Sequence, residues 1–170
     1  MADQPLAQIV DENDNPIGAK SVPEIRNKGL LHRLARVMVE DSNGNILLQK
    51  RIKNAVVYPG RWDNSAAGHV DDGETYEQAA IREAAEEIGL LNVSLTEIGY
   101  LRHTAKDNGR VTSRFVKFFR TVVSSDTKFE VQPEEVDEVE WFKIDDAKKL
   151  AAEHPEQMTD GLIYALKHYF

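Results

Sequence analysis

Cysteine is absent from this chain of 170 residues, and its absence removes several kinds of chemistry. Without a thiol, the chain forms no disulfide, binds no metal through a thiolate and uses no cysteine nucleophile. Proteins without disulfides are typical of reducing compartments, so we expect a cytoplasmic location. Residues 1–10 lack a basic segment followed by a long apolar one, so we also expect no export signal.

Long apolar runs and an excess of positive charge are missing as well. No stretch is apolar over the roughly 20 residues that a membrane span requires, so we expect no membrane partner. The chain has 21 Lys and Arg residues against 29 Asp and Glu residues, a net charge of -8. This balance disfavours nonspecific binding to nucleic acid. The length suits one domain with one core, so residues 1–170 are expected to form a single domain.

Short apolar runs separated by turn residues predict a mixed α/β fold. Asn-Gly pairs at residues 43–44 and 108–109 predict tight turns between strands. Residues 23–29 fit neither a strand nor a helix clearly. Strands are expected at residues 6–10, 17–20, 34–40, 46–49, 93–104, 114–122 and 139–142, and C-terminal helices at residues 146–153 and 159–168.

The segment GHVDDGETYEQAAIREAAEEIGL, residues 68–90, predicts a further helix with well-defined ends. Thr75 and Gln78 fit a capping box at its start, and Gly89 fits the left-handed residue that ends many helices. Ile81, Ala84 and Ile88 form an apolar stripe that we expect to pack on a sheet. The acidic residues are then expected to face outward on another side of the helix.

Three of these acids are spaced for one face of the helix. Glu83, Glu86 and Glu87 stand at positions i, i+3 and i+4, where like charges repel by a few tenths of a kcal/mol per pair. A cluster of carboxylate oxygens suits a hard divalent cation such as Mg²⁺, which binds a few carboxylates together with water and substrate phosphates. The alternative is an acidic helix face that is merely solvated.

The same segment resembles the signature of the Nudix hydrolases. That signature has Gly, five residues, Glu, seven residues, Arg-Glu, an apolar residue, any residue, Glu-Glu, any residue, Gly and an aliphatic residue. The matching positions are Gly68, Glu74, Arg82, Glu83, Ala84, Glu86, Glu87, Gly89 and Leu90. The resemblance implies a Nudix-type α/β/α sandwich with a central mixed sheet. It also implies an enzyme that cleaves a diphosphate linkage in a small molecule with Mg²⁺, for which Mn²⁺ can substitute.

The resemblance also implies roles for individual residues. The expected metal ligands are Gly68, Glu83, Glu86 and Glu87, and the expected catalytic carboxylates are Glu83, Glu86 and Glu135. Glu135 is the candidate for a base outside the signature, because it precedes the strand DEVEWF, and Glu134 and Glu138 stay open as alternatives. Arg82 and Glu74 are expected to form a structural clamp between the loop and the helix.

Basic residues cluster in residues 50–61 of this otherwise acidic chain. Lys50 and Arg51 are expected to bind substrate phosphate, with Lys53 and Arg61 nearby in sequence. A solvated loop is the alternative reading of this cluster. The Tyr58-Pro59-Gly60 sequence predicts a turn, and Trp62 predicts aromatic packing.

A wider resemblance covers about residues 8–90 and concerns the isopentenyl-diphosphate isomerase branch of the Nudix superfamily. It rests on the stretches VDENDNPIG, GLLHRLARVMVED, ILLQKR and YPGRWDNSAAGHV. The isomerases have a catalytic cysteine where this chain has Ala67. Of their metal ligands, His32 and His69 are kept, whereas Ile25, Arg114 and Val116 stand where a histidine and two glutamates are expected.

Three functions follow from these resemblances. The first is hydrolysis of a nucleoside diphosphate derivative or a related organic diphosphate, which the intact signature favours. The second is isopentenyl-diphosphate isomerisation, which the missing cysteine disfavours. The third is a noncatalytic nucleotide-binding module. Members of the superfamily often form homodimers, so a homodimer is an open alternative to a monomer, as is a residual metal role for His32 and His69.

Overall fold

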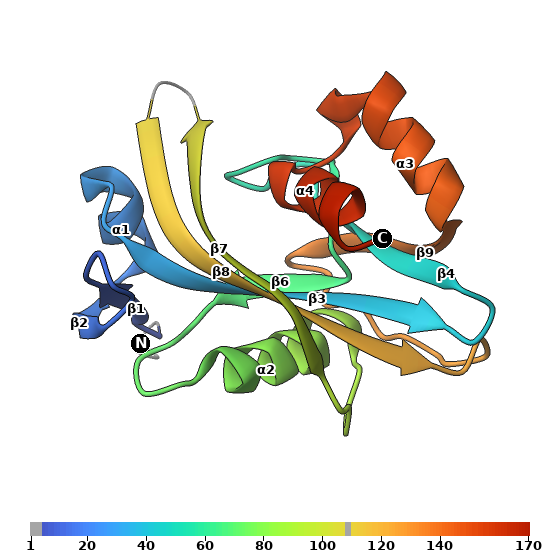
Figure 1. The fold of residues 1–170 in the computed structure, drawn as a ribbon, viewed down its shortest axis with the longest axis horizontal. Helices are drawn as coiled ribbons and strands as arrows, with labels where there is room; N and C mark the ends of the chain where they lie inside the picture. Colours follow the sequence, from blue (N-terminus) through green and yellow to red (C-terminus); the bar gives the residue numbers. More distant parts are fainter. Residues whose placement is uncertain (1–4, 108–109) are drawn as a thin grey trace.

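A mixed sheet runs through the middle of the protein, whose computed structural model describes residues 5–107 and 110–170 (Figure 1). Its strands within the described part are β1 (Ala7–Val10), β2 (Pro16–Lys20), β3 (His32–Asp41), β4 (Asn45–Arg51), β5 (Trp62–Asp63), β6 (Ala66–His69), β7 (Thr96–Asp107), β8 (Arg110–Val123) and β9 (Val136–Lys143). The helices are α1 (Val22–Lys28), α2 (Tyr76–Ile88), α3 (Ile144–Glu153) and α4 (Asp160–His168), with a 3-10 turn at Pro155–Gln157.

Strand β3 is the centre of this sheet. It pairs in parallel with β8, with His32 opposite Arg114 in the register. Its other edge pairs antiparallel with β6, where Leu34 lies opposite His69, and farther along with β4, where Val39 lies opposite Leu47. The start of β3 therefore lies between the end of β6 and the middle of β8, two segments that are far apart in sequence.

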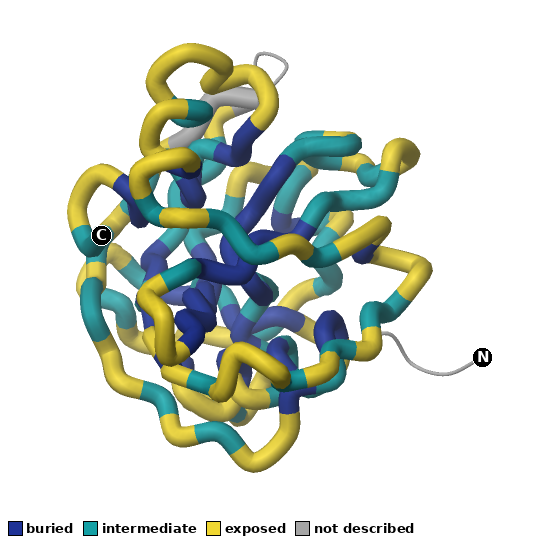
Figure 2. The backbone as a smooth tube through the Cα atoms, turned by 90° about the vertical axis from the view of Figure 1, so that its right-hand side faces the viewer, coloured by how far each residue is buried: buried dark blue, intermediate teal, exposed yellow. Residues whose placement is uncertain are grey.

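Helices cover both faces of the sheet, so the prediction of an α/β/α sandwich with a mixed sheet is confirmed. Helix α2 lies on one face, and α3 and α4 lie on the other (Figure 1). Alternate residues of β3 point to opposite faces: Val37 and Val39 belong to the core beneath α2, whereas Met38 packs with Leu162 and Leu166 of α4. The buried backbone forms the centre of the molecule (Figure 2).

Helix α2 begins and ends where the sequence predicts. The Gln78 backbone N–H donates to the Thr75 hydroxyl and the Thr75 N–H donates to the Gln78 side chain, which completes the capping box. Gly89 ends the helix with a φ of 68°. In addition, no helix in the described residues is long and apolar enough to cross a membrane.

The prediction of which α2 side chains face the core and which face solvent is wrong for two residues. Ile81 is 38% exposed and lies outside the core, and Glu87 is 2% exposed and points inward. The buried line follows Tyr76, Ala80 and Ala84, because these small alanines let the helix approach the sheet closely. A helix rotated this way carries Glu87 into the interior and turns Ile81 toward solvent.

Other differences concern short elements and boundaries. Residues 23–28 form most of α1, which Ser21 caps and Gly29 ends with a φ of 63°. Strand β7 starts at Thr96, three residues later than expected, and the predicted turn at residues 108–109 lies outside the described residues. Strands β5 and β6 were not predicted, because their short sequences carry no alternating apolar pattern.

Gly89 provides a stability test of the α2 terminus. A Cβ at this position would lie 3.1 Å from the Glu130 carbonyl oxygen and would need a positive φ. We expect Gly89→Ala to lower the free energy of unfolding by about 2–3 kcal/mol in urea titrations. Gly44 is the matched control, since its φ is 79° but nothing lies within 4 Å. Gly44→Ala should cost only about 1 kcal/mol; equal losses would show that the Glu130 contact is unimportant.

Candidate active site

The approach of α2 to β6 determines where the acidic residues lie. Gly68 of β6 sits directly against the Glu83 carboxylate, and a Cβ at Gly68 would collide with that carboxylate. The side chain of Glu83 is therefore held against the backbone of β6, with a side-chain exposure of 12%. Only glycine permits this contact, which explains the residue type at position 68.

Arg82 joins the loop before α2 to the helix and to β6. Its Nε donates to Glu74 Oε1 at 2.8 Å, and its Nη2 donates to Glu74 Oε2 at 3.0 Å and to the His69 carbonyl oxygen at 2.9 Å. Its Nη1 donates to Glu83 at 2.8 Å and to Glu86 at 3.3 Å. The bond to Glu74 is the largest cause of the raised pKa of Arg82. Arg82 also pairs with Asp71 at 3.5 Å and therefore faces four carboxylates of the segment at once.

Glu87 lies deeper than the other acids. Its Oε2 accepts hydrogen bonds from the Gln49 side chain at 2.8 Å and from the Ala67 backbone N–H at 2.9 Å. Burial, and then the charge of Glu83, raises the pKa of Glu87 well above its usual range. Glu87 is absent from the described residues that line the neighbouring cavity, whereas Glu83 and Glu86 are among them.

Glu83 carries the clearest electrostatic signature of the site. Burial raises its pKa to about 7, Arg82 opposes the rise, and the charges of Glu86 and Glu135 add to it. Glu135 therefore lies near the acidic helix although it is far away in sequence, and it lines the same cavity. Neither Glu134 nor Glu138 is among the described residues of that lining.

The donor set of this segment fits a hard cation in its chemistry. It consists of carboxylate oxygens, and burial, with a smaller contribution from neighbouring carboxylates, raises the pKa values of Glu83 and Glu87. In residues 5–107 and 110–170, however, no three His, Asp or Glu side chains are placed so that they could hold one ion together. Glu83 and Glu86 contact Arg82 in this arrangement.

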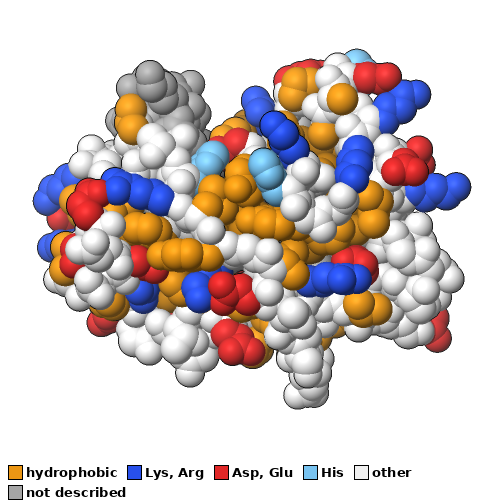
Figure 3. Space-filling model, in the orientation of Figure 1, with side chains coloured by type: hydrophobic (Ala, Val, Ile, Leu, Met, Phe, Trp, Pro, Cys, Tyr) orange, Lys and Arg blue, Asp and Glu red, His pale blue; other side chains and the backbone are white. Residues whose placement is uncertain are grey.

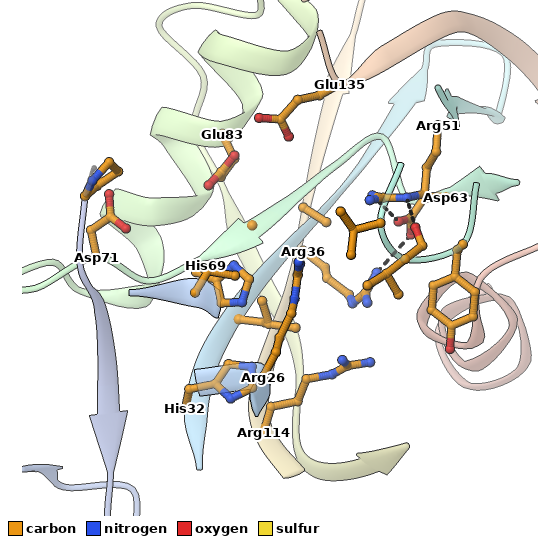
Figure 4. Close-up of a pocket in the computed structure, with 18 of the residues that line it drawn as sticks. Arg26, His32, Arg36, Arg51, Asp63, His69, Asp71, Glu83, Arg114 and Glu135 are labelled. Atoms are coloured by element: carbon orange, nitrogen blue, oxygen red, sulfur yellow. Dashed lines mark hydrogen bonds and ion pairs between the residues drawn. The ribbon is translucent and has the colours of Figure 1, made fainter. Parts of the chain in front are cut away.

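A cavity of about 620 Å³ opens beside these carboxylates. Figure 4 shows Glu83 and Glu135 on one side and His32, Arg26 and Arg114 on the opposite side. Its charged lining residues are Arg26, Arg36, Arg51, Asp63, Asp71, Arg82, Glu83, Glu86, Arg114 and Glu135. On the surface seen in Figure 3, charges of both signs are interspersed. The arginines in the cavity are therefore a local concentration of positive charge in an acidic protein.

The two predicted substrate-binding residues have different positions. Arg51 lines the cavity, donates from Nε to the Val57 carbonyl oxygen at 3.0 Å and pairs with Asp63 at 3.5 Å. Lys50 is not among the described lining residues; its Nζ donates to Glu138 at 3.0 Å and lies over the Trp62 ring. Adjacent strand residues point to opposite faces, which explains why the two separate.

His32 and His69 form a stacked pair, with ring centroids 5.2 Å apart. Burial lowers the pKa of His32 to about 4, and burial followed by the charge of His32 lowers that of His69 well below its usual range. Both rings are therefore neutral at pH 7. His32 Nδ1 lies 2.8 Å from the Leu30 carbonyl oxygen, so this nitrogen carries the proton of the neutral ring.

The sequence did not identify three of the arginines that line the cavity, Arg26, Arg36 and Arg114, which together form its basic wall. Arg36 lies within the apolar run of β3, and a charged residue at such a position could have indicated a functional site. Arg26 stands in a segment with no clear prediction, and Arg114 was singled out only as a replacement for a glutamate. Gln49, the partner of Glu87, is polar within the apolar strand β4 and could have been found in the same way.

An acidic helix on a mixed sheet, beside a cavity lined by arginines, is an arrangement suited to enzymes that act on phosphorus-containing anhydrides. Comparisons with known proteins support this assignment. The family model described as the NUDIX domain matches residues 30–161. The chain therefore belongs to the Nudix family and is an enzyme of the Nudix hydrolase type.

Individual relatives include both branches that the sequence resembles. An uncharacterized Nudix hydrolase of Yersinia pestis is 38% identical over 134 residues, which cover 79% of this chain and 70% of the relative. Isopentenyl-diphosphate Delta-isomerase 2 of Photorhabdus laumondii is 32% identical over 152 residues, 89% of this chain and 84% of the relative. The crystal structure of DR0079 from Deinococcus radiodurans shares the fold, with a TM-score of 0.77 at 22% identity and coverage of 97% and 99% of the two chains.

The raised pKa of Glu83 predicts a pH dependence of stability in the metal-free protein. Unfolded Glu83 ionises near 4.5 and folded Glu83 near 7, so its contribution to the free energy of unfolding falls as pH rises through this window. We expect this loss to reach about 3 kcal/mol by pH 8. Urea titrations in a chelator should show a weaker pH dependence for Glu83→Gln than for the wild type, and parallel curves would contradict the prediction.

Proposed function

We propose that this protein is a Mg²⁺-dependent hydrolase that cleaves the diphosphate linkage of a nucleoside diphosphate derivative or a related organic diphosphate. The observation that carries the proposal is the shared cavity: Glu83, Glu86 and Glu135 line it, and Glu83 and Glu135 lie opposite Arg26 and Arg114. A diphosphate ester is a small polyanion, and its hydrolysis requires both compensation of its charge and an activated water.

The metal would be held by the Gly68 carbonyl oxygen and by Glu83, Glu86 and Glu87, with Mn²⁺ able to replace Mg²⁺. When bound, the cation supplies neutralisation of phosphate charge and acidification of a water molecule. The raised pKa values of Glu83 and Glu87, caused first by burial and then by neighbouring carboxylates, support this assignment, because a nearby cation would favour the ionised form of such groups.

The arginines would bind and orient the substrate. Guanidinium groups make paired, charge-assisted hydrogen bonds to phosphate oxygens, and these bonds are stronger in a partly desolvated cavity. Arg51 and Arg36 are fixed by Asp63, which accepts from Arg36 Nη1 at 2.9 Å and pairs with Arg51 at 3.5 Å. Preorganised side chains of this kind lose less entropy when the substrate binds.

Glu135 would act as the general base that accepts the proton of the attacking water. It lines the cavity on the same side as Glu83, and its charge contributes to the raised pKa values of both Glu83 and Glu87. A carboxylate at this position faces the cavity from a segment outside α2. It is therefore free of the Arg82 contacts that engage Glu83 and Glu86.

Isomerisation of isopentenyl diphosphate is the alternative raised by some of the relatives. At the position of the isomerase cysteine, the methyl group of Ala67 cannot donate or accept a proton. Its backbone N–H is also engaged with Glu87 at 2.9 Å. Arg114 and Val116 offer no carboxylate at the positions of the two glutamates that bind metal in the isomerases. These substitutions favour hydrolysis, whereas a noncatalytic binding module would need no base such as Glu135.

The remaining expectations stay predictions. They comprise a cytoplasmic location, the absence of nucleic-acid and membrane partners, a homodimer as an alternative to the monomer, and phosphate binding by Lys50. The ion pair of Lys50 with Glu138 would have to open before its Nζ could reach a substrate.

The function can be tested with a panel of nucleotide sugars, nucleoside diphosphates, dinucleoside polyphosphates, coenzyme derivatives and isoprenoid diphosphates. Product release should require Mg²⁺ and stop with excess chelator. We expect Glu87→Gln to lower kcat by at least about 10³-fold, since a weakened metal site would lose both the neutralisation of phosphate charge and the acidification of water. Glu77→Gln is the matched control, because Glu77 lies exposed in the first turn of the same helix.

The control variant should keep wild-type turnover, and circular dichroism should show both variants folded. Near wild-type turnover of folded Glu87→Gln would refute the role of this residue. No turnover of any compound by the wild type, with ligand binding still detectable, would favour the noncatalytic module. Conversion of isopentenyl diphosphate to its allylic isomer would instead establish the alternative reaction.

A further inference from the structure

The cavity wall opposite the carboxylates contains an arginine with few partners. The side chain of Arg114 on β8 is 12% exposed, and its Nε is buried without a hydrogen-bond partner among the described residues. Its Nη2 lies 3.4 Å and 3.5 Å from the two Asp160 oxygens, at the outer limit for hydrogen bonds. A buried guanidinium held this loosely is costly to the fold.

Arg36 supports the same wall from the neighbouring strand β3. Its Nη1 donates to Asp63 at 2.9 Å and to Asn64 at 2.8 Å. Gly161 at the start of α4 lies against the guanidinium, and a Cβ there would collide with it. Arg36 is therefore locked in place, and its charge, after the effect of burial, contributes to the lowered pKa of Arg114.

Helix α1 adds a third arginine to this region. Arg26 lines the cavity, and its charge contributes to the lowered pKa values of both His32 and His69. In the view of Figure 4, His69 lies between Glu83 and His32, and His32 lies beside Arg26 and Arg114.

The acids of this region do not balance its arginines. Asp63 faces both Arg36 and Arg51, and Asp160 also accepts from His103 Nε2 at 2.7 Å. Burial opposes ionisation of Asp160, but the His103 bond and the charges of Arg114 and Arg36 keep its pKa well below the usual range. Two aspartates thus face three arginines, Arg36, Arg51 and Arg114, which leaves an excess of positive charge in this group.

We propose that Arg114, with Arg36 and Arg26, forms a second anion-binding subsite that takes a phosphoryl group of the substrate remote from the diphosphate linkage that is cleaved. This inference rests on the proposed function and specifies its substrate class: organic diphosphates that carry a further phosphate monoester. A phosphate fits because its oxygens can accept from Nε and Nη of one guanidinium together. The cavity volume of about 620 Å³ leaves room for both groups of such a substrate.

A purely structural role for Arg114 predicts a different behaviour. An arginine that stabilises the fold should lower the melting temperature when it is replaced. If Arg114 serves to bind an anion, its replacement should leave the melting temperature of the anion-free protein unchanged or raise it, because the substitution removes a buried charge with few partners. Arg114→Gln therefore separates the two roles before any ligand is added.

Thermal unfolding with added inorganic phosphate tests the subsite, and EDTA is present so that no turnover occurs. Phosphate should raise the melting temperature of the wild type by binding the folded state. The increase should be lost in Arg114→Gln and partly kept in Arg114→Lys. Arg120→Gln is the matched control, because Arg120 lies on the same strand and pairs with Glu40, outside the described cavity lining.

A matched ligand pair then tests selectivity by calorimetry in the same metal-free buffer. ADP-ribose 2′-phosphate should bind the wild type and Arg120→Gln about tenfold or more tightly than ADP-ribose, and the two should bind Arg114→Gln equally. An equal response of Arg114→Gln and the wild type to phosphate, or no response of either, would overturn the subsite. These measurements involve no hydrolysis, so they decide the subsite whether or not the diphosphate panel yields turnover.

Discussion

The close contact between β6 and α2 is the constraint on which the site depends. Gly68 lets the Glu83 carboxylate rest on the strand backbone, and Arg82 then ties the helix to the His69 carbonyl oxygen and to Glu74. A side chain at position 68 would push α2 away from the sheet. The acids would then lie in water, with ordinary pKa values and no cavity beside them. The electrostatics of the site therefore follow from one permitted backbone approach.

Strand β3 converts this local contact into a complete cavity. Because it pairs with β6 on one edge and with β8 on the other, it places His69 and Arg114 on either side of its first residues. Strand β6, which contacts the acidic helix, and strand β8, which carries Arg114, are far apart in sequence, yet each pairs directly with β3. A shift of the β3–β8 register by one residue would turn Arg114 to the other face of the sheet.

The structural features that the sequence predicts correctly are those that interactions between nearby residues determine. The capping box at Thr75, the terminal Gly89 and the apolar runs of the main strands depend on neighbouring residues, and they appear in the structure as expected. The inward turn of Glu87 and the exposure of Ile81 depend on how the helix docks, which its own periodicity leaves open. The basic wall was missed for a related reason: Arg26, Arg36 and Arg114 lie on three separate elements and meet only through the sheet pairing.

The two ends of the cavity hold opposite charges that compensate each other only in part. Arg82 neutralises some of the acidic cluster, and Asp63 and Asp160 neutralise some of the arginines, but neither end reaches balance within itself. A fold selected for stability alone would bring the surplus charges together, since their attraction grows as water is excluded. Keeping them apart costs stability, and a polyanion bound with a cation relieves the surplus at both ends. The marginal pairing of Arg114 is therefore best understood as part of binding.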